Sequence, residues 1–184
     1  MSRDITLLLS RFQAGDDGAM NALAELIYPE LKAMARRRAN NDLQLSATTL
    51  VNETFLKLLS GARVASEDRQ QFFGLAATVM RQIIVDEVRY ATAQKRNAPQ
   101  ATYSDTRVGD ESQEHAELLL QIDRFVDQLA SEDEQLARTF ECRYFAGFST
   151  AETAEIVGVS ERTAERLWSR ARERIATLLK QPSS

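Results

Sequence analysis

The residues best suited to chemistry are the arginines and hydroxyl side chains of one predicted helix near the carboxyl end. The stretch from Phe148 to Leu179 reads FSTAETAEIVGVSERTAERLWSRARERIATLL. Arginine can donate paired hydrogen bonds to guanine edges in the major groove of DNA, and arginine or serine can hold phosphates. The candidate DNA contacts are Arg162, Thr163, Arg166, Ser169, Arg170 and Arg172.

Two predicted helices and a tight turn position these side chains. The first helix has a small, apolar face that a second helix can cross closely, made by Ala151, Ala154, Ile156 and Val157. Gly158 suits the left-handed backbone at a helix end, and Ser160 suits the N-cap of the next helix. Apolar residues then recur at three- and four-residue spacing, namely Ala164, Leu167, Trp168, Ala171, Ile175 and Leu178. The pattern favours a helix-turn-helix over the alternative, an ordinary helical hairpin with a solvated charged face.

The composition predicts an all-α protein. Glycine and proline number 7 and 3 among 184 residues, and no segment shows sustained strand alternation. The net charge of −4 argues weakly against nucleic-acid binding, because phosphate contacts need cations. The charge is unevenly distributed, however: acid gathers in 105–117 and 123–134, while basic residues gather at 36–38, around Arg89 to Arg96, and in 162–174.

Other chemistry finds little support in the sequence. A single cysteine, Cys142, excludes an intramolecular disulfide, and we expect it in the core rather than as a nucleophile. His115 stands alone, so we expect no metal site, and without a phosphate-binding glycine loop or nucleophile motif we expect neither a cofactor nor an enzyme. No export signal or membrane-spanning run is apparent, so a cytoplasmic location is expected.

The amino-terminal part reads as a series of helices. Short helices are expected over 4–12 and from Ala19 onward, with Pro29 kinking or restarting the second and the basic residues 36–38 on a solvated face. A helix within 43–61 has Ser46, Thr48 and Thr49 at its start, of which one is expected to cap it. A long helix follows over about 72–95, with Phe72 expected in the core.

The segment 97–114, NAPQATYSDTRVGDESQE, has proline, glycine, serine and acid with almost no apolar residues. It predicts a flexible linker. Helical periodicity resumes afterwards and stops at Gly147. We therefore expect two small helical domains, 1–96 and 115–184, joined by the linker 97–114.

Three passages in this order resemble the extracytoplasmic-function (ECF) group of σ70-family sigma factors, which consist of σ2 and σ4 domains. LVNETFLKLL at 50–59 resembles the polymerase-binding helix, and VMRQIIVDEVR at 79–89 resembles the helix that reads the −10 promoter element. VGVSERTAERLWSRARERI at 157–175 resembles the reader of the −35 element. The resemblance spans nearly the whole chain.

The resemblance implies a sigma factor that directs transcription initiation, with core RNA polymerase and promoter DNA as partners. The σ2-like domain would bind the β′ clamp helices and open the −10 region, with 62–71 as the loop that captures a flipped base. The σ4-like domain would bind the β flap and read −35 through the arginine-rich helix. Implied polymerase contacts are Leu50, Val51, Asn52, Glu53, Phe55 and Leu56, and implied −10 contacts are Arg69, Arg81, Gln82 and Arg89.

One departure from the family concerns the start of the polymerase-binding helix. Family members usually have an acidic run there, whereas this chain has Ser46, Ala47, Thr48 and Thr49. A phosphate on Ser46, Thr48 or Thr49 would restore about two negative charges at the end of a helix that favours them. We therefore hypothesise that a Ser/Thr kinase is a partner and activates the protein. The alternative is that apolar contacts suffice for polymerase binding and the hydroxyls only cap the helix.

A rival reading is a helix-turn-helix regulator that acts without joining RNA polymerase. An anti-sigma factor is possible for this class of protein, but no residue in the sequence indicates one. Footprinting by the isolated protein would favour the rival, whereas a requirement for core enzyme would favour a sigma factor.

Overall fold

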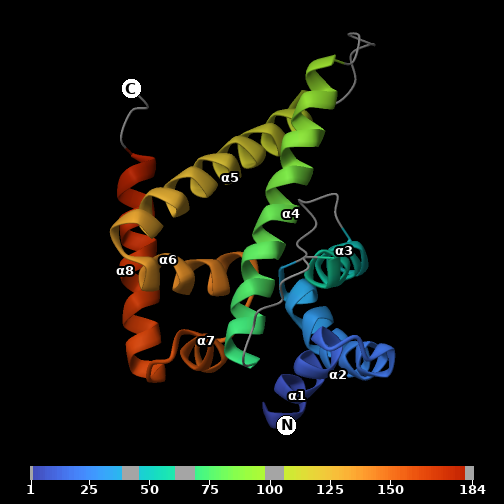
Figure 1. Ribbon diagram of the computed structural model, residues 1–184. Helices are drawn as coiled ribbons and strands as arrows, with labels where there is room; N and C mark the ends of the chain where they lie inside the picture. The colour runs from blue at the N-terminus through green and yellow to red at the C-terminus, as the bar shows by residue number, and fades with distance from the viewer. Residues whose placement is uncertain (1, 39–45, 61–68, 98–105, 181–184) are drawn as a thin grey trace.

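The computed structural model describes residues 2–38, 46–60, 69–97 and 106–180. All regular structure in these ranges is helical, which confirms the all-α class (Figure 1). No helix in these ranges has the length and apolar character needed to cross a bilayer. The elements are α1 (Ser2–Gln13), α2 (Asp17–Arg38), α3 (Ala47–Ser60), α4 (Arg69–Asn97), α5 (Thr106–Glu132), α6 (Glu134–Phe140), the π-helix η1 (Glu141–Phe145), α7 (Thr150–Val157) and α8 (Glu161–Leu179).

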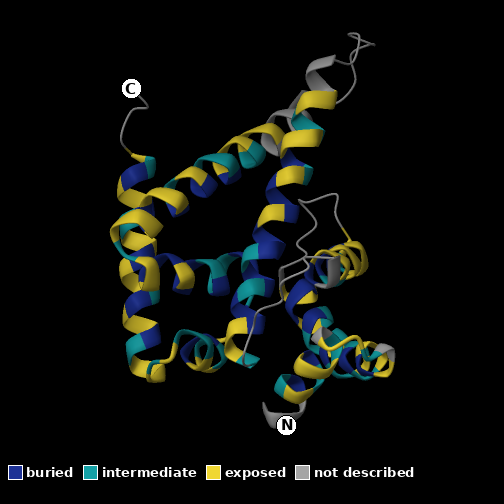
Figure 2. Cartoon of the chain, in the orientation of Figure 1, coloured by how far each residue is buried: buried dark blue, intermediate teal, exposed yellow. Residues whose placement is uncertain are grey.

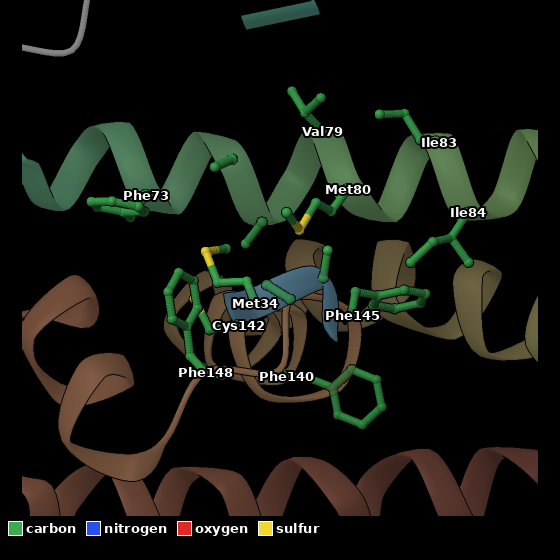
Figure 3. Close-up of a cluster of buried hydrophobic side chains, with 14 of the residues drawn as sticks. Met34, Phe73, Val79, Met80, Ile83, Ile84, Phe140, Cys142, Phe145 and Phe148 are labelled. Atoms are coloured by element: carbon green, nitrogen blue, oxygen red, sulfur yellow. The ribbon is translucent and has the colours of Figure 1, made fainter. Parts of the chain in front are cut away.

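Helix α4 lies at the centre of the molecule, and apolar side chains project from two of its sides. Val79 and Ile83 point to one side, whereas Met80 and Ile84 point to the opposite side, toward Phe145 of η1 (Figure 3). All five side chains are buried. A helix that is apolar on two sides must be covered on both. Helix α3 packs against α4 on one side, and η1, α5 and α7 pack against it elsewhere.

The carboxyl-terminal half consists of α5 to α8, and its helices α5 and α6 pack against α8. The predicted apolar face of α8 is confirmed: Ala164, Leu167, Ala171, Ile175 and Leu178 are buried, with Trp168 partly so. The ring centroids of Trp168 and Phe140 of α6 lie 5.6 Å apart. The opposite face of α8 is exposed (Figure 2), so packing orients the arginine-bearing face outward.

Buried side chains from the amino-terminal half, α1 to α4, and from the carboxyl-terminal half form one continuous cluster. Phe73 of α4 meets Phe148, which precedes α7, edge to face with ring centroids 6.1 Å apart. Cys142 and Phe145 of η1 are fully buried, so the core position expected for Cys142 is confirmed. The two halves are therefore in contact, and their division into separate domains stays a prediction.

The structure corrects several sequence expectations. Part of the predicted linker is helical, since α5 begins at Thr106; arginine, glutamate and glutamine in the stretch 106–114 are good helix formers even without apolar partners. Helix α2 continues through Pro29 instead of restarting, and Pro29 is exposed. Ala151, expected in the apolar face of α7, is exposed. Thr153 is buried in that face instead. Most of the segment 62–71 lies outside the described residues, and its last three residues begin α4.

The cap at the start of α8 can be tested by substitution. The Ser160 side chain accepts a hydrogen bond from the Thr163 amide at 3.2 Å, so we expect Ser160→Ala to lower the free energy of unfolding by about 1 kcal/mol. Urea denaturation would measure the change. Ser169→Ala is the control, because Ser169 is exposed within α8 and alanine favours helix. Equal losses in both variants would contradict a specific role for the cap.

Candidate nucleic-acid interface

The turn between α7 and α8 has the geometry that the sequence predicts. Gly158 ends α7 with φ of 74°, a left-handed conformation that most residues adopt only with strain. Ser149 and Glu152 form a capping box at the start of α7, and Ser160 caps α8. These caps define the end of α7 and the start of α8 and confirm the two predicted helices and the tight turn between them.

The predicted DNA contacts on α8 fall into two groups. Arg162, Arg166 and Ser169 are exposed, and neither arginine pairs with a carboxylate among the described residues. Thr163 is partly buried, and its hydroxyl lies 3.0 Å from that of Ser160. The first two turns of α8 thus present two exposed arginines, Arg162 and Arg166, as insertion into a DNA groove requires.

Farther along α8, the arginines interact with the protein itself. Arg170 lies 3.9 Å from Asp133, and the Arg172 guanidinium lies 5.5 Å from the centre of the Trp168 ring. Arg174 is paired with Glu132 of α5 at 2.9 Å. These exposed interactions are individually weak, but Arg174 faces α5 rather than the open side of α8.

Arg81, a predicted −10 contact, is buried instead, with only 9% of its side chain exposed. Its Nε donates to Asp123 Oδ1 at 2.8 Å, its Nη1 to Glu141 Oε1 at 2.7 Å and its Nη2 to Asp127 Oδ1 at 2.6 Å. Burial acts to lower the pKa of Arg81, but the hydrogen bonds to the three carboxylates outweigh it and raise that pKa. Arg81 is therefore a charged group satisfied within the protein, and in this structure it cannot contact DNA.

The other predicted −10 residues also lie at the contact between the halves. Arg69 pairs with Glu30 of α2, lies 3.7 Å from Glu155 of α7 and covers the Phe73 ring. Arg89 lies 3.2 Å from Asp123 of α5 and is exposed. Gln82 is exposed and lines a cleft between α4 and α5 together with Arg81 and Arg89.

The carboxylate partners of these arginines are residues that the sequence analysis did not assign to any site. In the carboxyl-terminal half they are Asp123 and Asp127 of α5, Glu141 of η1 and Glu155 of α7; in the amino-terminal half they are Glu30 of α2 and Asp86 of α4. The acidic run at 123–134 was a signal that some surface there attracts cations. It could not indicate which cations, because the pairs that join the two halves are separated by 34 residues or more along the chain.

Arg37 is exposed, as expected for a solvated face, and it also pairs with Glu152 of α7 at 2.7 Å. The hydrogen bond from Arg37 is the main cause that lowers the pKa of Glu152 to about 2, assisted by the Ser149 amide. The carboxylate therefore stays ionised over the whole neutral range. It joins the capping box of α7 to α2.

The predicted polymerase contacts divide into a buried and an exposed set. Leu50 and Val51 are buried in the protein's own core, so in this structure they are not available to a partner, and their role as polymerase contacts stays a prediction. Asn52, Glu53 and Leu56 are exposed, Leu56 by 63%, and Phe55 is partly exposed. Positions 49, 52, 53 and 56 share one side of a helix, and they form a continuous outward face of α3.

The hydroxyl cluster lies at the start of that face. Ser46 is the cap, since its Oγ accepts from the Thr49 amide at 3.1 Å, and the two hydroxyl oxygens lie 2.9 Å apart. Thr48 is exposed, and its hydroxyl forms no hydrogen bond with the described residues. The first turn of α3 contains no acidic residue. The expectation that one hydroxyl caps the helix is confirmed.

Comparison with known families now identifies the class of protein. A model of the ECF sigma factor family matches residues 2–181. The chain belongs to this family. As an ECF sigma factor, it is a protein that binds RNA polymerase and promoter DNA in transcription initiation. None of the curated proteins compared with this sigma factor matches it.

The pairing of Arg37 and Glu152 in this sigma factor predicts a pH dependence. Because the pKa of Glu152 is lowered from 4.5 to about 2, its contribution to stability is full above about pH 4.5 and is lost as the pH falls toward 2. We expect Glu152→Gln, which keeps the capping box, to lower the free energy of unfolding at pH 7 by about 1 kcal/mol after allowance for solvent screening. The deficit should shrink between about pH 4.5 and 2.

Urea denaturation at several pH values would measure that deficit. Glu173→Gln is the control, because Glu173 is exposed and its carboxylate pairs with no described residue. A deficit of Glu152→Gln that is the same at every pH would show that the charge of Glu152 contributes nothing.

Proposed function

We propose that this ECF sigma factor reads the −35 element through α8, contacts the −10 region through α4 and binds core RNA polymerase through the exposed face of α3. We further propose that phosphorylation at the start of α3 by a Ser/Thr kinase enables polymerase binding. The observation that carries the second proposal is the uncharged hydroxyl cluster, which continues into the exposed side chains of α3.

The role of α8 is supported by the contrast between its two arginine groups. Arg162 and Arg166 project from the first two turns without carboxylate partners among the described residues. A helix that enters the major groove contacts bases through its amino-terminal residues. The later arginines, which interact with Asp133, Trp168 and Glu132, suit phosphate contact or packing instead.

The proposed phosphorylation is supported by chemistry at the amino-terminal end of α3. Backbone amides at a helix start carry partial positive charge, so a phosphate there is tolerated without a nearby cation. Thr48 is exposed, and its hydroxyl is not used to cap the helix. A phosphate on Thr48 or Thr49 would extend negative charge along the face that already includes Glu53. Basic clamp residues of polymerase would be its counterpart.

Base reading by α8 predicts unequal effects for two arginines of the same helix. We expect Arg166→Ala to lower promoter-specific transcription by about tenfold or more, because a paired arginine–base contact is worth about 1–3 kcal/mol. Run-off transcription with core polymerase would measure it. Arg174→Ala is the matched control, since Arg174 pairs with Glu132; we expect less than about a twofold change. Equal effects would contradict base reading by Arg166.

Phosphorylation predicts that negative charge at the start of α3 activates the protein. We expect the double variant Thr48→Glu and Thr49→Glu to bind core polymerase about tenfold more tightly and to give more run-off transcript, because a charged contact is worth about 1.5–3 kcal/mol. Gln at both positions is the matched control, since it has nearly the same shape without charge. Equal polymerase affinity of the wild type, Glu and Gln variants would overturn the proposed switch.

The same assay separates a sigma factor from a regulator that acts alone. A sigma factor requires core polymerase for promoter-specific binding and supports initiation by an enzyme that otherwise lacks specificity. A footprint from the isolated protein, with no transcript when it is added to core polymerase, would favour the regulator.

A further inference from the structure

The ion pairs between the two halves all have the same polarity. Among the described residues, each joins an arginine of α2 or α4 to a carboxylate of α5, η1 or α7. The pairs are Arg37–Glu152, Arg69–Glu155, Arg81 with Asp123, Asp127 and Glu141, and Arg89–Asp123. We call this set the clasp. A basic surface of the amino-terminal half is thus covered by an acidic surface of the carboxyl-terminal half.

We propose that the clasp holds the sigma factor in a closed state, in which the carboxyl-terminal half occupies the DNA-contacting arginines of α4, and that the halves must separate before the −10 region is bound. This inference rests on the proposed function in one respect, namely that these arginines contact promoter DNA. The separation of the halves is a property of the protein alone and can be measured without DNA.

The hydrogen bonds of Arg81 explain why the closed state excludes DNA. All three guanidinium nitrogens donate to the carboxyl-terminal half, and Nη2 also donates to the Asp123 backbone oxygen at 2.7 Å. Carboxylates at these distances take the positions that phosphate or base acceptors would need. Arg81 can contact DNA only after Asp123 and Glu141, both largely buried, move away.

Apolar packing behind the ion pairs makes the closed state a specific arrangement. Cys142 and Phe145 of η1 lie beneath α4, with Met34 of α2 beside Cys142 (Figure 3). Phe148 packs on Phe73. The clasp therefore lies at the edge of an apolar contact. Its ion pairs fix how the two halves are oriented relative to each other across that contact. Opening exposes apolar surface, which a binding partner such as polymerase would have to offset.

The two DNA-contacting surfaces differ in this closed state. Arg162 and Arg166 of α8 stay exposed, whereas the arginines of α4 are engaged. The closed protein can therefore present its −35 surface to duplex DNA while Arg81, at the middle of its −10 surface, is covered. Separation of the halves is the step that would make both available.

Cys142 provides a direct probe of opening. It is the only cysteine in the chain and is fully buried where η1 meets α4. Burial raises the pKa of its thiol to about 12, so the closed form should not react with a thiol reagent. The rate of labelling by a disulfide reagent then reports the fraction of time that the halves are apart.

We expect the double variant Asp123→Asn and Glu141→Gln to label at Cys142 at least tenfold faster than the wild type while keeping its helical circular dichroism. The matched control is Glu117→Gln and Glu132→Gln, which removes the same charge from the carboxyl-terminal half; Glu132 pairs with Arg174 in that half, and Glu117 accepts from Gln113. The control should label at the wild-type rate. Equal labelling of both double variants would overturn the clasp.

Global unfolding would also expose Cys142, so a stability control is needed. Leu9→Ala creates a cavity in the packing of α1, far from the clasp in the chain. Urea denaturation gives the free energy of unfolding of each variant. Labelling of the clasp variant must exceed that of Leu9→Ala when the two are compared at equal free energy of unfolding. If labelling follows global stability alone, the halves do not separate and the proposal is wrong.

Binding of a fluorescent single-stranded oligonucleotide to the full-length protein forms the second arm. We expect the clasp variant to bind at least fivefold more tightly than the Glu117→Gln and Glu132→Gln control, since its arginines are released. Faster labelling without tighter DNA binding would show that the halves separate but that the α4 arginines are not DNA contacts. That result would overturn both the occlusion and the proposed role of α4, while leaving the α3 switch intact.

Discussion

The position of α4 depends on one constraint, which is that its apolar residues lie on both of its sides. Val79 and Ile83 need cover from one direction and Met80 and Ile84 from the other (Figure 3). Helix α3 packs on α4, and η1 supplies Phe145 and Cys142 from the carboxyl-terminal half. A flexible connection between independent domains would leave one of these sides exposed to water. The contact between the halves therefore follows from the composition of α4, and the arginine pairs assemble around that contact.

Charge then decides which surfaces of this sigma factor are available. A buried arginine remains favourable only when carboxylates satisfy it, and loss of one partner from such a cluster costs about 3–5 kcal/mol. Arg81 meets this requirement through three carboxylates of the other half. The arginines at the start of α8 have no such partners among the described residues. The same residue type is thus structural in one place and available to DNA in another.

The sequence was sufficient for features that local physics controls. Gly158 and Ser160 define the turn, and the spacing of Leu167, Ala171 and Ile175 orients α8. It was not sufficient for the surroundings of Arg81, because a helical position near Val79 and Ile83 can be read as exposed unless the second packing partner is known. The prediction of a linker over 97–114 was wrong in part for another reason. Polar and acidic residues suit both a linker and a solvated helix, and residues from Thr106 onward belong to α5. The burial of Leu50 and Val51 was concealed in the same way, since an apolar pair can face the core or a partner.

Two separate controls on this ECF sigma factor would act at different places on the chain. Charge at the start of α3 would govern attachment to polymerase, and the clasp would govern access to the −10 surface. An ion-pair route connects their neighbourhoods, from Lys57 of α3 through Asp86 to Arg89 and Asp123. Its first two pairs, Lys57–Asp86 and Asp86–Arg89, are exposed and have distances of 3.7 and 3.6 Å, so they are too weak to transmit a switch by themselves. Polymerase would instead couple the two controls if it binds α3 and also has higher affinity for the form with separated halves. The equilibrium between the closed and separated forms would then shift by the difference between the two affinities.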